Sequence, residues 1–361
     1  MRVLGFMSGT SLDGVDAAIL DTDGVAVTGL GPALLLPFTQ AEREVLLRAT
    51  ADALRTDGAE PAPASFGEAS RTIVAAHVRA ARALLARPEA GTIELIGFHG
   101  QTVLHRPERG LSIQLGDPAA LAAALGVPVV ARLRQRDLAA GGQGAPLVPV
   151  YHAALAHWLG SARPVAFLNV GGVANVSFVG EAGELTAFDT GPGNGLIDLM
   201  LQQRTGARYD DGGRLAAGGR VDQAALQAMM TSPYLDRPGP KSLDRHDFSL
   251  DPVAALDIAD AAATLTAFTA ASVADAVRHL PAAPRCWVVC GGGRHNRVMM
   301  AALRARLPLV TDADALGLRG DFLEAEAFAF LAARSVRGLP ITFPGTTGVG
   351  GPTTGGEVFR P

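Results

Sequence analysis

The first 36 residues alternate between short apolar segments and turns rich in glycine, serine and threonine. Residues 2–7 form an apolar run typical of a buried strand, and residues 15–20 alternate in polarity as a second strand. The turn at 8–14 joins these strands, and a turn at 21–24 leads into an apolar stretch over 25–36. The pattern therefore predicts a β-hairpin that continues into a meander.

Helical and strand patterns then follow one another along the first half. Residues 39–54 predict a helix with Thr39 as its N-cap, and residues 65–86 predict a second helix. Shorter apolar segments up to residue 131 predict strands around one more helix. The first half is thus predicted to be an α/β domain.

An apolar strand predicted over 93–98 ends in His99–Thr102. Open α/β sheets bind their ligands at the carboxyl ends of strands. His99 alone is more typical of a structural histidine, whereas Gln101 and Thr102 beside it favour a hydrogen-bonded sugar or another polar ligand.

The second half of the chain begins as the first does. Strands are predicted at 164–169, 176–179 and 185–189, with a glycine-rich turn at 170–175 between the first two. Strand, glycine-rich tip, strand, turn and strand thus occur twice, about 165 residues apart. Internal duplication of this kind predicts two similar α/β domains that face one another across a cleft.

A segment rich in glycine and proline at 141–149 reads as a rigid connection between the two copies. We place the domain boundary near it, with residues 1–135 as the N-terminal domain and residues 136–344 as the C-terminal domain. The tail over 345–361 is rich in glycine, threonine and proline. We expect this tail to join the N-terminal domain.

The stretch Phe188–Asp198 holds the clearest candidate chemistry, because an apolar segment delivers one carboxylate, Asp189, into a turn with three glycines and a proline. Backbone without side chains at a strand end lets a ligand come close. An ordinary strand–turn–helix connection capped by Asp189 explains the same residues. Taken alone, the stretch favours neither interpretation.

Three glycine-rich segments are candidates for binding a nucleotide. The tip at 8–14 is dense in glycine and hydroxyl groups and favours phosphate over a plain polar turn. The tip at 170–175 is its counterpart in the second copy. Gly291, Gly292 and Gly293 end a predicted strand, where bare backbone allows a flat ring such as adenine to approach.

Two charged clusters have open interpretations. Arg132–Asp137 holds three arginines and is either a solvated face or an anion-binding rim beside Gly141–Gly144. Glu324 and Glu326 lie near the start of a predicted helix and point in different directions. One carboxylate is expected to stabilise the helix N-terminus through its negative charge, and the other is available to a ligand.

Composition narrows the class of protein. The 361 residues carry 35 acidic and 31 basic side chains, a formal charge of −4, without a basic block that would indicate nucleic acid. Apolar runs are shorter than the about 18 residues that span a membrane, and a signal-peptide pattern is missing. Cys286 and Cys290 lie too far apart along one strand to form a disulfide. We therefore expect a cytoplasmic protein with reduced cysteines.

Lys241 is the only lysine of the chain. A P-loop ends in Gly-Lys followed by Ser or Thr, whereas Lys241 follows Pro240. The chain is therefore not a P-loop nucleotidase.

Several motifs, in order along nearly the whole chain, resemble those of the anhydro-N-acetylmuramic acid kinase family. They are Met7–Asp16, His99–Thr102, Ala139–Pro149, Asn169–Asn175, Asp189–Asn194, Gly239–Ser242 and Cys290–Gly293. This family is part of the acetate and sugar kinase, Hsp70 and actin superfamily. The resemblance implies two ribonuclease-H-like domains with ATP between them.

The resemblance also implies the reaction. The family uses ATP with magnesium to convert 1,6-anhydro-N-acetylmuramic acid to N-acetylmuramic acid 6-phosphate, which recycles cell-wall sugar in the cytoplasm. The implied partners are small molecules, with neither nucleic acid nor a membrane. The oligomeric state is left open, with a homodimer as one alternative.

Roles are carried over from the family residue by residue. Asp189 is the expected general base for an attacking water. Expected ATP contacts are Gly9, Thr10, Ser11, Leu12, Asp13, Gly14, Val15, Asp16, Gly171, Gly172, Asn175, Gly291, Gly292 and Gly293. Expected sugar contacts are Gln101, Thr102, Arg134 and Glu324, and the metal is assigned to no residue. The chain has Arg132-Leu133 where the family shows Asp-Phe, so no role is carried over to position 132.

Two other functions fit parts of the pattern. One is a kinase for an ordinary sugar hydroxyl, in which Asp189 deprotonates the hydroxyl itself. The other is an ATP-gated scaffold like the chaperone and actin members of the superfamily. A scaffold would need a peptide-binding extension or a filament surface, for which 361 residues leave no room.

Overall fold

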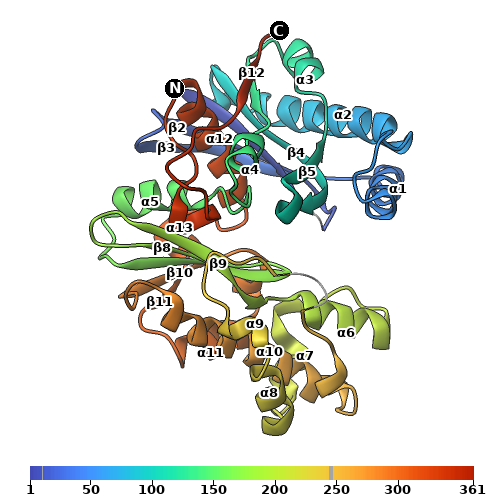
Figure 1. The fold of residues 1–361 in the computed structure, drawn as a ribbon, viewed down its shortest axis with the longest axis vertical. Coiled ribbons are helices and arrows are strands. Elements are labelled where there is room, and N and C mark those ends of the chain that lie inside the picture. Colours follow the sequence, from blue (N-terminus) through green and yellow to red (C-terminus); the bar gives the residue numbers. More distant parts are fainter. Residues whose placement is uncertain (10, 244–246) are drawn as a thin grey trace. The chain divides into compact units, whose positions relative to one another are not determined.

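The computed structural model describes residues 1–9, 11–243 and 247–361. The chain divides into two compact units (Figure 1). Unit 1 comprises Met1–Trp158 together with Phe322–Pro361, and unit 2 comprises Leu159–Asp321. Among the described residues, the longest apolar helices fall short of what a membrane crossing requires.

Unit 1 is built on one sheet in the order β12-β6-β4-β1-β2-β3, with β5 paired to β4. β1, β2 and β3 are antiparallel, while β4 runs parallel to β1 and to β6. The strands are β1 (Arg2–Ser8), β2 (Gly14–Thr22), β3 (Val27–Pro37), β4 (Leu95–Arg106), β5 (Leu111–Leu115), β6 (Val129–Ala131) and β12 (Glu357–Phe359). The helices are α1 (Gln40–Thr56), α2 (Ser65–Leu85), α3 (Pro118–Leu125), α4 (Gln135–Ala139), α5 (Pro149–Trp158), α12 (Leu323–Val336) and α13 (Pro344–Thr347).

Unit 2 repeats this plan in the order β11-β10-β7-β8-β9. β7, β8 and β9 are antiparallel, while β10 runs parallel to β7 and to β11. The strands are β7 (Val165–Val170), β8 (Val173–Val179), β9 (Leu185–Pro192), β10 (Cys286–Cys290) and β11 (Val310–Asp312). The helices are α6 (Gly195–Thr205), α7 (Arg214–Gly218), α8 (Gln223–Met230), α9 (Pro233–Asp236), α10 (Ile258–Asp275) and α11 (Arg297–Arg304).

The predicted duplication is therefore confirmed in the strand order. Each sheet has three antiparallel strands, and further strands lie on the far side of the first: β4, β6 and β12 in unit 1, and β10 and β11 in unit 2. This order is the ribonuclease-H-like topology. Both copies arise from the same local pattern, since a glycine-rich tip joins the first two strands and a second turn leads to the third. The free thiols Cys286 and Cys290 lie on β10, as expected.

The observed division between the units differs from the predicted 1–135 and 136–344. Helix α12 belongs to unit 1 because it packs on β1, β2 and β4. Small residues make this contact close: a Cβ at Gly5 would overlap the carbonyl oxygen of Ala325, and one at Gly97 would overlap that of Phe328. The tail lies in unit 1 as well, where β12 pairs with β6.

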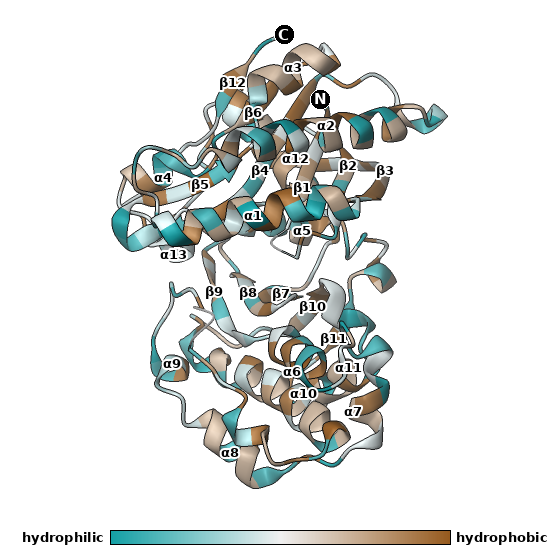
Figure 2. Cartoon of the chain, turned by 90° about the vertical axis from the view of Figure 1, so that its right-hand side faces the viewer, coloured by the Kyte–Doolittle hydropathy of each residue, from teal (hydrophilic) through white to brown (hydrophobic). Residues whose placement is uncertain are grey.

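Helix α1 begins where its sequence predicts. Thr39 Oγ1 accepts from the Glu42 N–H, and the Glu42 carboxylate accepts from the Thr39 N–H, which is a complete capping box. Figure 2 shows α1 alternating between polar and apolar residues, whereas α10 is largely apolar. The difference follows from burial, because α10 packs against α6, α7, α8 and α11 in unit 2.

Two sequence motifs lie inside strands, contrary to expectation. His99–Thr102 falls within β4, which continues to Arg106 because it pairs with β5 as a hairpin. Asn175 lies on β8 and not in the predicted turn. Asp189 lies on a strand as predicted, but β9 continues three residues beyond it, to Pro192. Each motif is therefore held by strand hydrogen bonds, which fix the side-chain directions.

Candidate active site

Asp189 is held from three sides by the chain of unit 2. Its carboxylate Oδ2 accepts from the Leu243 N–H at 2.8 Å, its N–H donates to the Lys241 carbonyl at 3.0 Å, and its carbonyl accepts from the Tyr234 hydroxyl at 2.8 Å. Burial raises the pKa of Asp189 to about 6, while the Leu243 N–H and the Lys241 charge act in the opposite direction. This pKa lies below 7, so the carboxylate is mostly ionised at pH 7 and can accept a proton.

The strand around Asp189 is bent by a β-bulge. Asn175 pairs with Asp189 and Ala174 pairs with Gly191, so Thr190 is the extra residue. The Thr190 hydroxyl donates to the Ala174 carbonyl at 3.1 Å and replaces part of the disrupted ladder. Bulges commonly re-aim a side chain beside an active site, and this one directly follows Asp189.

A polar row crosses the sheet of unit 2 next to Asp189. Asn169 on β7 pairs with Asn175 on β8, which pairs with Asp189 on β9. Directly opposed residues of antiparallel strands present their side chains on one face. Asn175 therefore lies beside the candidate base, and Asn169 is a candidate that the sequence assignment missed. The sequence pattern could have identified Asn169, because a hairpin whose turn is centred on Gly172 pairs residues 169 and 175.

The glycine-rich turns of unit 2 meet at the carboxyl end of β7. The Gly171 carbonyl accepts from the Asn194 N–H at 2.7 Å, and the Gly172 carbonyl accepts from Gly193 and Gly195 at 2.9 Å. The hairpin tip and the turn that follows Asp189 thus form one hydrogen-bonded structure.

These glycines serve different purposes. A Cβ at Gly193 would overlap the Gly171 carbonyl, and a Cβ at Gly293 would overlap the side chain of Val170. Open space surrounds Gly172 and Gly292. Backbone fills the space that a side chain at Gly193 would need, so this glycine is required by packing. Gly172 and Gly292 leave bare backbone with open space beside it.

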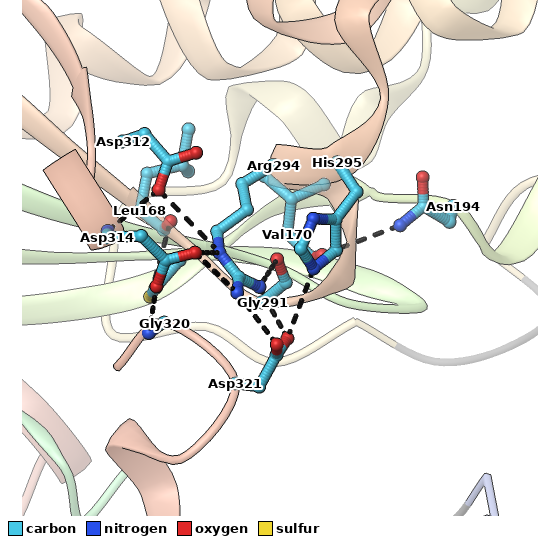
Figure 3. Close-up of polar contacts among 11 residues, drawn as sticks. Leu168, Val170, Asn194, Gly291, Arg294, His295, Asp312, Asp314, Gly320 and Asp321 are labelled. Carbon is cyan, nitrogen blue, oxygen red and sulfur yellow. Dashed lines mark hydrogen bonds and ion pairs between the residues drawn. The ribbon is translucent and has the colours of Figure 1, made fainter. Parts of the chain in front are cut away.

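Arg294 holds the third glycine turn in place (Figure 3). Its side chain is 2% exposed and donates to the Gly291 carbonyl at 3.1 Å, to Asp314 at 2.8 Å and to Asp321 at 2.7 Å. Asp314 in turn accepts from the Gly320 N–H at 2.8 Å. The hydrogen bonds from Arg294 lower the pKa of Asp321. One guanidinium therefore connects the end of β10 to the segment after β11.

The first hairpin tip lies in unit 1 between β1 and β2. Leu12, Gly14 and Val15 are buried in the tip, whereas Ser11 and Asp13 are exposed and Gly9 and Asp16 are half-buried. The Arg43 guanidinium lies 3.6 Å from the Asp13 carboxylate and donates to the Leu12 carbonyl at 2.9 Å. The buried members of the predicted ATP segment can offer a ligand only backbone groups. Thr10 lies outside the described residues.

The predicted sugar contacts of unit 1 form two small networks. Gln101 is 1% exposed and donates to the Gly9 carbonyl at 3.1 Å, so its amide supports the hairpin tip. Its Oε1 is buried and has no hydrogen-bond partner among the described residues. Thr102 accepts from Gln114 at 3.3 Å.

Arg134 forms the second network with His99. Its guanidinium donates to His99 Nε2 at 2.9 Å and to the Gly144 carbonyl at 2.6 Å. Burial and the Arg134 charge hold the pKa of His99 well below its usual value, so this histidine is neutral. Glu324 lies in the first turn of α12 and is exposed to solvent. Desolvation by the surrounding protein nevertheless raises the pKa of its carboxyl, while the Arg134 charge acts in the opposite direction.

A ribonuclease-H-like sheet repeated in two units, with a glycine-rich tip in each copy, defines the class as α/β proteins of duplicated ribonuclease-H-like fold. Comparison with known proteins narrows this class. The family model described as anhydro-N-acetylmuramic acid kinase matches residues 1–361. The chain belongs to the anhydro-N-acetylmuramic acid kinase family.

Relatives of the same name span the full chain. The anhydro-N-acetylmuramic acid kinase of Phenylobacterium zucineum is 53% identical over 370 residues, covering 100% of each chain. That of Caulobacter vibrioides is 54% identical, covering 99% of this chain and 98% of the relative. Among solved structures, the activator of 2-hydroxyisocaproyl-CoA dehydratase from Clostridium difficile with bound ADPNP covers 94% of this chain and 96% of its own, at 11% identity and a TM-score of 0.44.

Proposed function

We propose that this chain uses ATP to convert 1,6-anhydro-N-acetylmuramic acid to N-acetylmuramic acid 6-phosphate, within cell-wall sugar recycling in the cytoplasm. Water attacks C1, and its proton passes to Asp189. The C1–O6 bond breaks, and its electron pair stays on O6. O6 then takes the γ-phosphoryl group, and ADP leaves. Each bond that breaks is matched by one that forms.

The observation that carries this proposal is the environment of Asp189. A general base works best when its pKa lies near the working pH, and burial brings the pKa of Asp189 to about 6. The Leu243 N–H at 2.8 Å fixes Oδ2, and a carboxylate has a second oxygen that can accept the proton of water. Asn175 is the cross-strand partner of Asp189, and the β-bulge at Thr190 follows Asp189 directly.

The nucleotide would be held by backbone groups of the glycine turns. Gly172 and Gly292 have open space around them, and oriented backbone N–H groups bind phosphate without a lysine. We assign Gly171, Asn175, Gly291 and Gly293 of unit 2 to the nucleotide as well, several of them through the backbone alone. Gly9–Asp16 of unit 1 is the phosphate segment that the family resemblance implies. Phosphoryl transfer then depends on positioning and charge neutralisation.

Magnesium belongs to the proposal as a companion of ATP. Among the described residues, no group of three or more His, Cys, Asp or Glu side chains could hold a metal. Mg²⁺ is commonly bound by one or two carboxylates together with substrate phosphates and water. The ion would therefore arrive with the nucleotide and neutralise charge on its phosphates.

The residues that we propose to contact the sugar belong to unit 1. Arg134 is held at its place by His99 and Gly144, and it would carry a fixed positive charge to an anionic or polar sugar substituent. Glu324 and Thr102 would complete the hydrogen bonds. Gln101 would act through the Gly9 tip that it supports.

The decisive experiment follows oxygen from solvent. The purified chain is incubated with ATP, Mg²⁺ and the anhydro-sugar in H₂¹⁸O, under conditions in which the product does not exchange its anomeric oxygen. We expect one ¹⁸O at C1 of a 6-phosphorylated product. Phosphorylation of reducing N-acetylmuramic acid with no turnover of the anhydro-sugar would instead establish an ordinary hydroxyl kinase.

A further inference from the structure

Lys241 is a buried cation for which the proposed reaction has no direct use. It is the only lysine of the chain, it lies in unit 2 after α9, and it is 8% exposed. Lysine is almost never buried unless its charge is satisfied. The contacts of its ammonium group therefore indicate what the residue does.

The ammonium group is fixed by carbonyls and aromatic rings. Nζ donates to the Tyr234 carbonyl at 3.0 Å and to the Leu235 carbonyl at 3.3 Å, both on α9. It also lies 4.6 Å from the centre of the Tyr234 ring and 5.7 Å from that of Phe188, within the range of cation–π attraction. These contacts tie the Lys241 side chain to α9 and to the residue that precedes Asp189.

The backbone around Lys241 holds Asp189. The Lys241 carbonyl accepts from the Asp189 N–H at 3.0 Å, and two residues later the Leu243 N–H donates to Asp189 Oδ2 at 2.8 Å. Tyr234, whose carbonyl receives the ammonium group, donates its hydroxyl to the Asp189 carbonyl at 2.8 Å. The same anchor thus controls both the backbone and the carboxylate of Asp189.

We propose that Lys241 is a positioning residue for Asp189. Its ammonium group fixes the 241–243 segment so that the Leu243 N–H meets the carboxylate, and its charge favours the ionised carboxylate that accepts the proton of water. The inference rests on the proposed function, in which Asp189 is the base. It adds a residue that touches neither ATP nor sugar.

Lysine suits this position better than arginine. An ammonium group is a compact point charge with donors in a tetrahedral arrangement, whereas a guanidinium group is planar and broad. Burial lowers the pKa of Lys241 to about 8, so the group is still mostly charged at pH 7. Among the described residues of unit 2, the charged and titratable groups around Asp189 and Lys241 are Tyr234, Asp236, Arg237, Asp247, Asp275, Arg278 and His279.

The first test compares Lys241→Met with Lys241→Arg in the pH profile of kcat. Loss of the charge removes one factor that lowers the pKa of Asp189, so the acid limb of Lys241→Met moves to higher pH. A base misplaced by about 1 Å can cost about 100-fold in rate, and we expect a fall of that order in kcat with KM for ATP near its wild-type value. Lys241→Arg should return the acid limb toward wild type.

Arg278→Met is the matched control. Arg278 donates to the same Leu235 carbonyl at 3.0 Å, but its ion pairs are with Asp236 and Asp275. This variant should leave the acid limb in place. An unmoved acid limb in a folded Lys241→Met protein, shown by circular dichroism and melting, overturns the proposal. Wild-type protein without anhydro-sugar turnover would overturn the proposed function instead.

The second test needs no turnover, because a single lysine gives a single ¹⁵N signal. In protein labelled with ¹⁵N-lysine, the Nζ resonance is titrated in wild type and in Asp189→Asn. Coupling between two sites is reciprocal, so loss of the Asp189 charge should move the Lys241 titration to lower pH. An identical titration in both proteins overturns the proposal, even if the Lys241 variants fail to fold.

Discussion

Replacement of Asp189 by asparagine should lower activity and raise stability at the same time. The amide keeps the shape of the carboxylate and an oxygen for the Leu243 N–H, but it accepts no proton from water. A general base contributes typically 10²–10⁴-fold, so kcat should fall by at least about 100-fold. The backbone groups proposed for ATP are unchanged, and the Kd for ATP should stay near the wild-type value.

The stability effect follows from the raised pKa of Asp189. Its pKa is about 6 in the folded chain against 3.8 for the ordinary group, so the folded state binds more protons between these two values. The free energy of unfolding therefore falls as pH rises from about 4 to about 6, and each tenfold difference in acidity is worth about 1.4 kcal/mol. Above pH 6 the ionised Asp189 carboxylate lowers the free energy of unfolding by up to about 3 kcal/mol. An asparagine at this position carries no charge and avoids this cost.

Urea unfolding of wild type and Asp189→Asn at pH 4 and pH 8 measures this cost. The two proteins should have similar free energies of unfolding at pH 4, and the variant should be more stable at pH 8. Asp211→Asn is the control, because the Asp211 side chain is 68% exposed in an ion pair with Arg214, and it should alter neither activity nor stability appreciably. Near-normal kcat in Asp189→Asn would refute the base assignment, and equal stability at pH 8 would refute the desolvated carboxylate.

Two further predictions concern the nucleotide side of unit 2. Gly172→Ala adds a methyl group in open space, so the variant should fold normally while its Kd for ATP rises. Gly193→Ala forces overlap with the Gly171 carbonyl and should lower the melting temperature. Calorimetry with ATP and thermal melts distinguish the two variants, and equal melting temperatures would contradict the packing argument. Arg294→Met removes the guanidinium from Gly291, Asp314 and Asp321 and should destabilise the chain by less than the roughly 3–5 kcal/mol of a fully buried pair, because both carboxylates are about half exposed. Its Kd for ATP should rise, and unchanged ATP binding would separate Arg294 from the nucleotide site.

Local pattern was enough to predict much of the fold. Both meanders, the Thr39 cap of α1 and the helix over 65–86 are confirmed, because strand alternation, capping residues and glycine-rich turns are encoded within a few neighbouring residues. The duplication could be read from the same signals, since it repeats one local pattern.

Long-range packing decided what the sequence pattern could not. Helix α12 contacts Gly5 and Gly97, and nothing in its own apolar spacing indicates which sheet it covers. The glycines present the same difficulty: Gly172 and Gly193 are indistinguishable in sequence, yet one faces open space and the other faces backbone. The β-bulge at Thr190 depends on register across β8 and β9, which a single strand does not reveal.

The placement of the only lysine suits the strength required of the base. A cation in direct contact with a carboxylate commonly lowers its pKa by 1–3 units, which would leave Asp189 ionised but too weak to take a proton from water. Here the Lys241 ammonium group donates to the Tyr234 and Leu235 carbonyls, and its charge lowers the pKa of Asp189 by less than burial raises it. Burial can then keep the pKa of Asp189 at about 6, while the Leu243 N–H fixes the direction of the carboxylate. A base that is both ionised at neutral pH and still basic requires this separation between the anchor and the carboxylate.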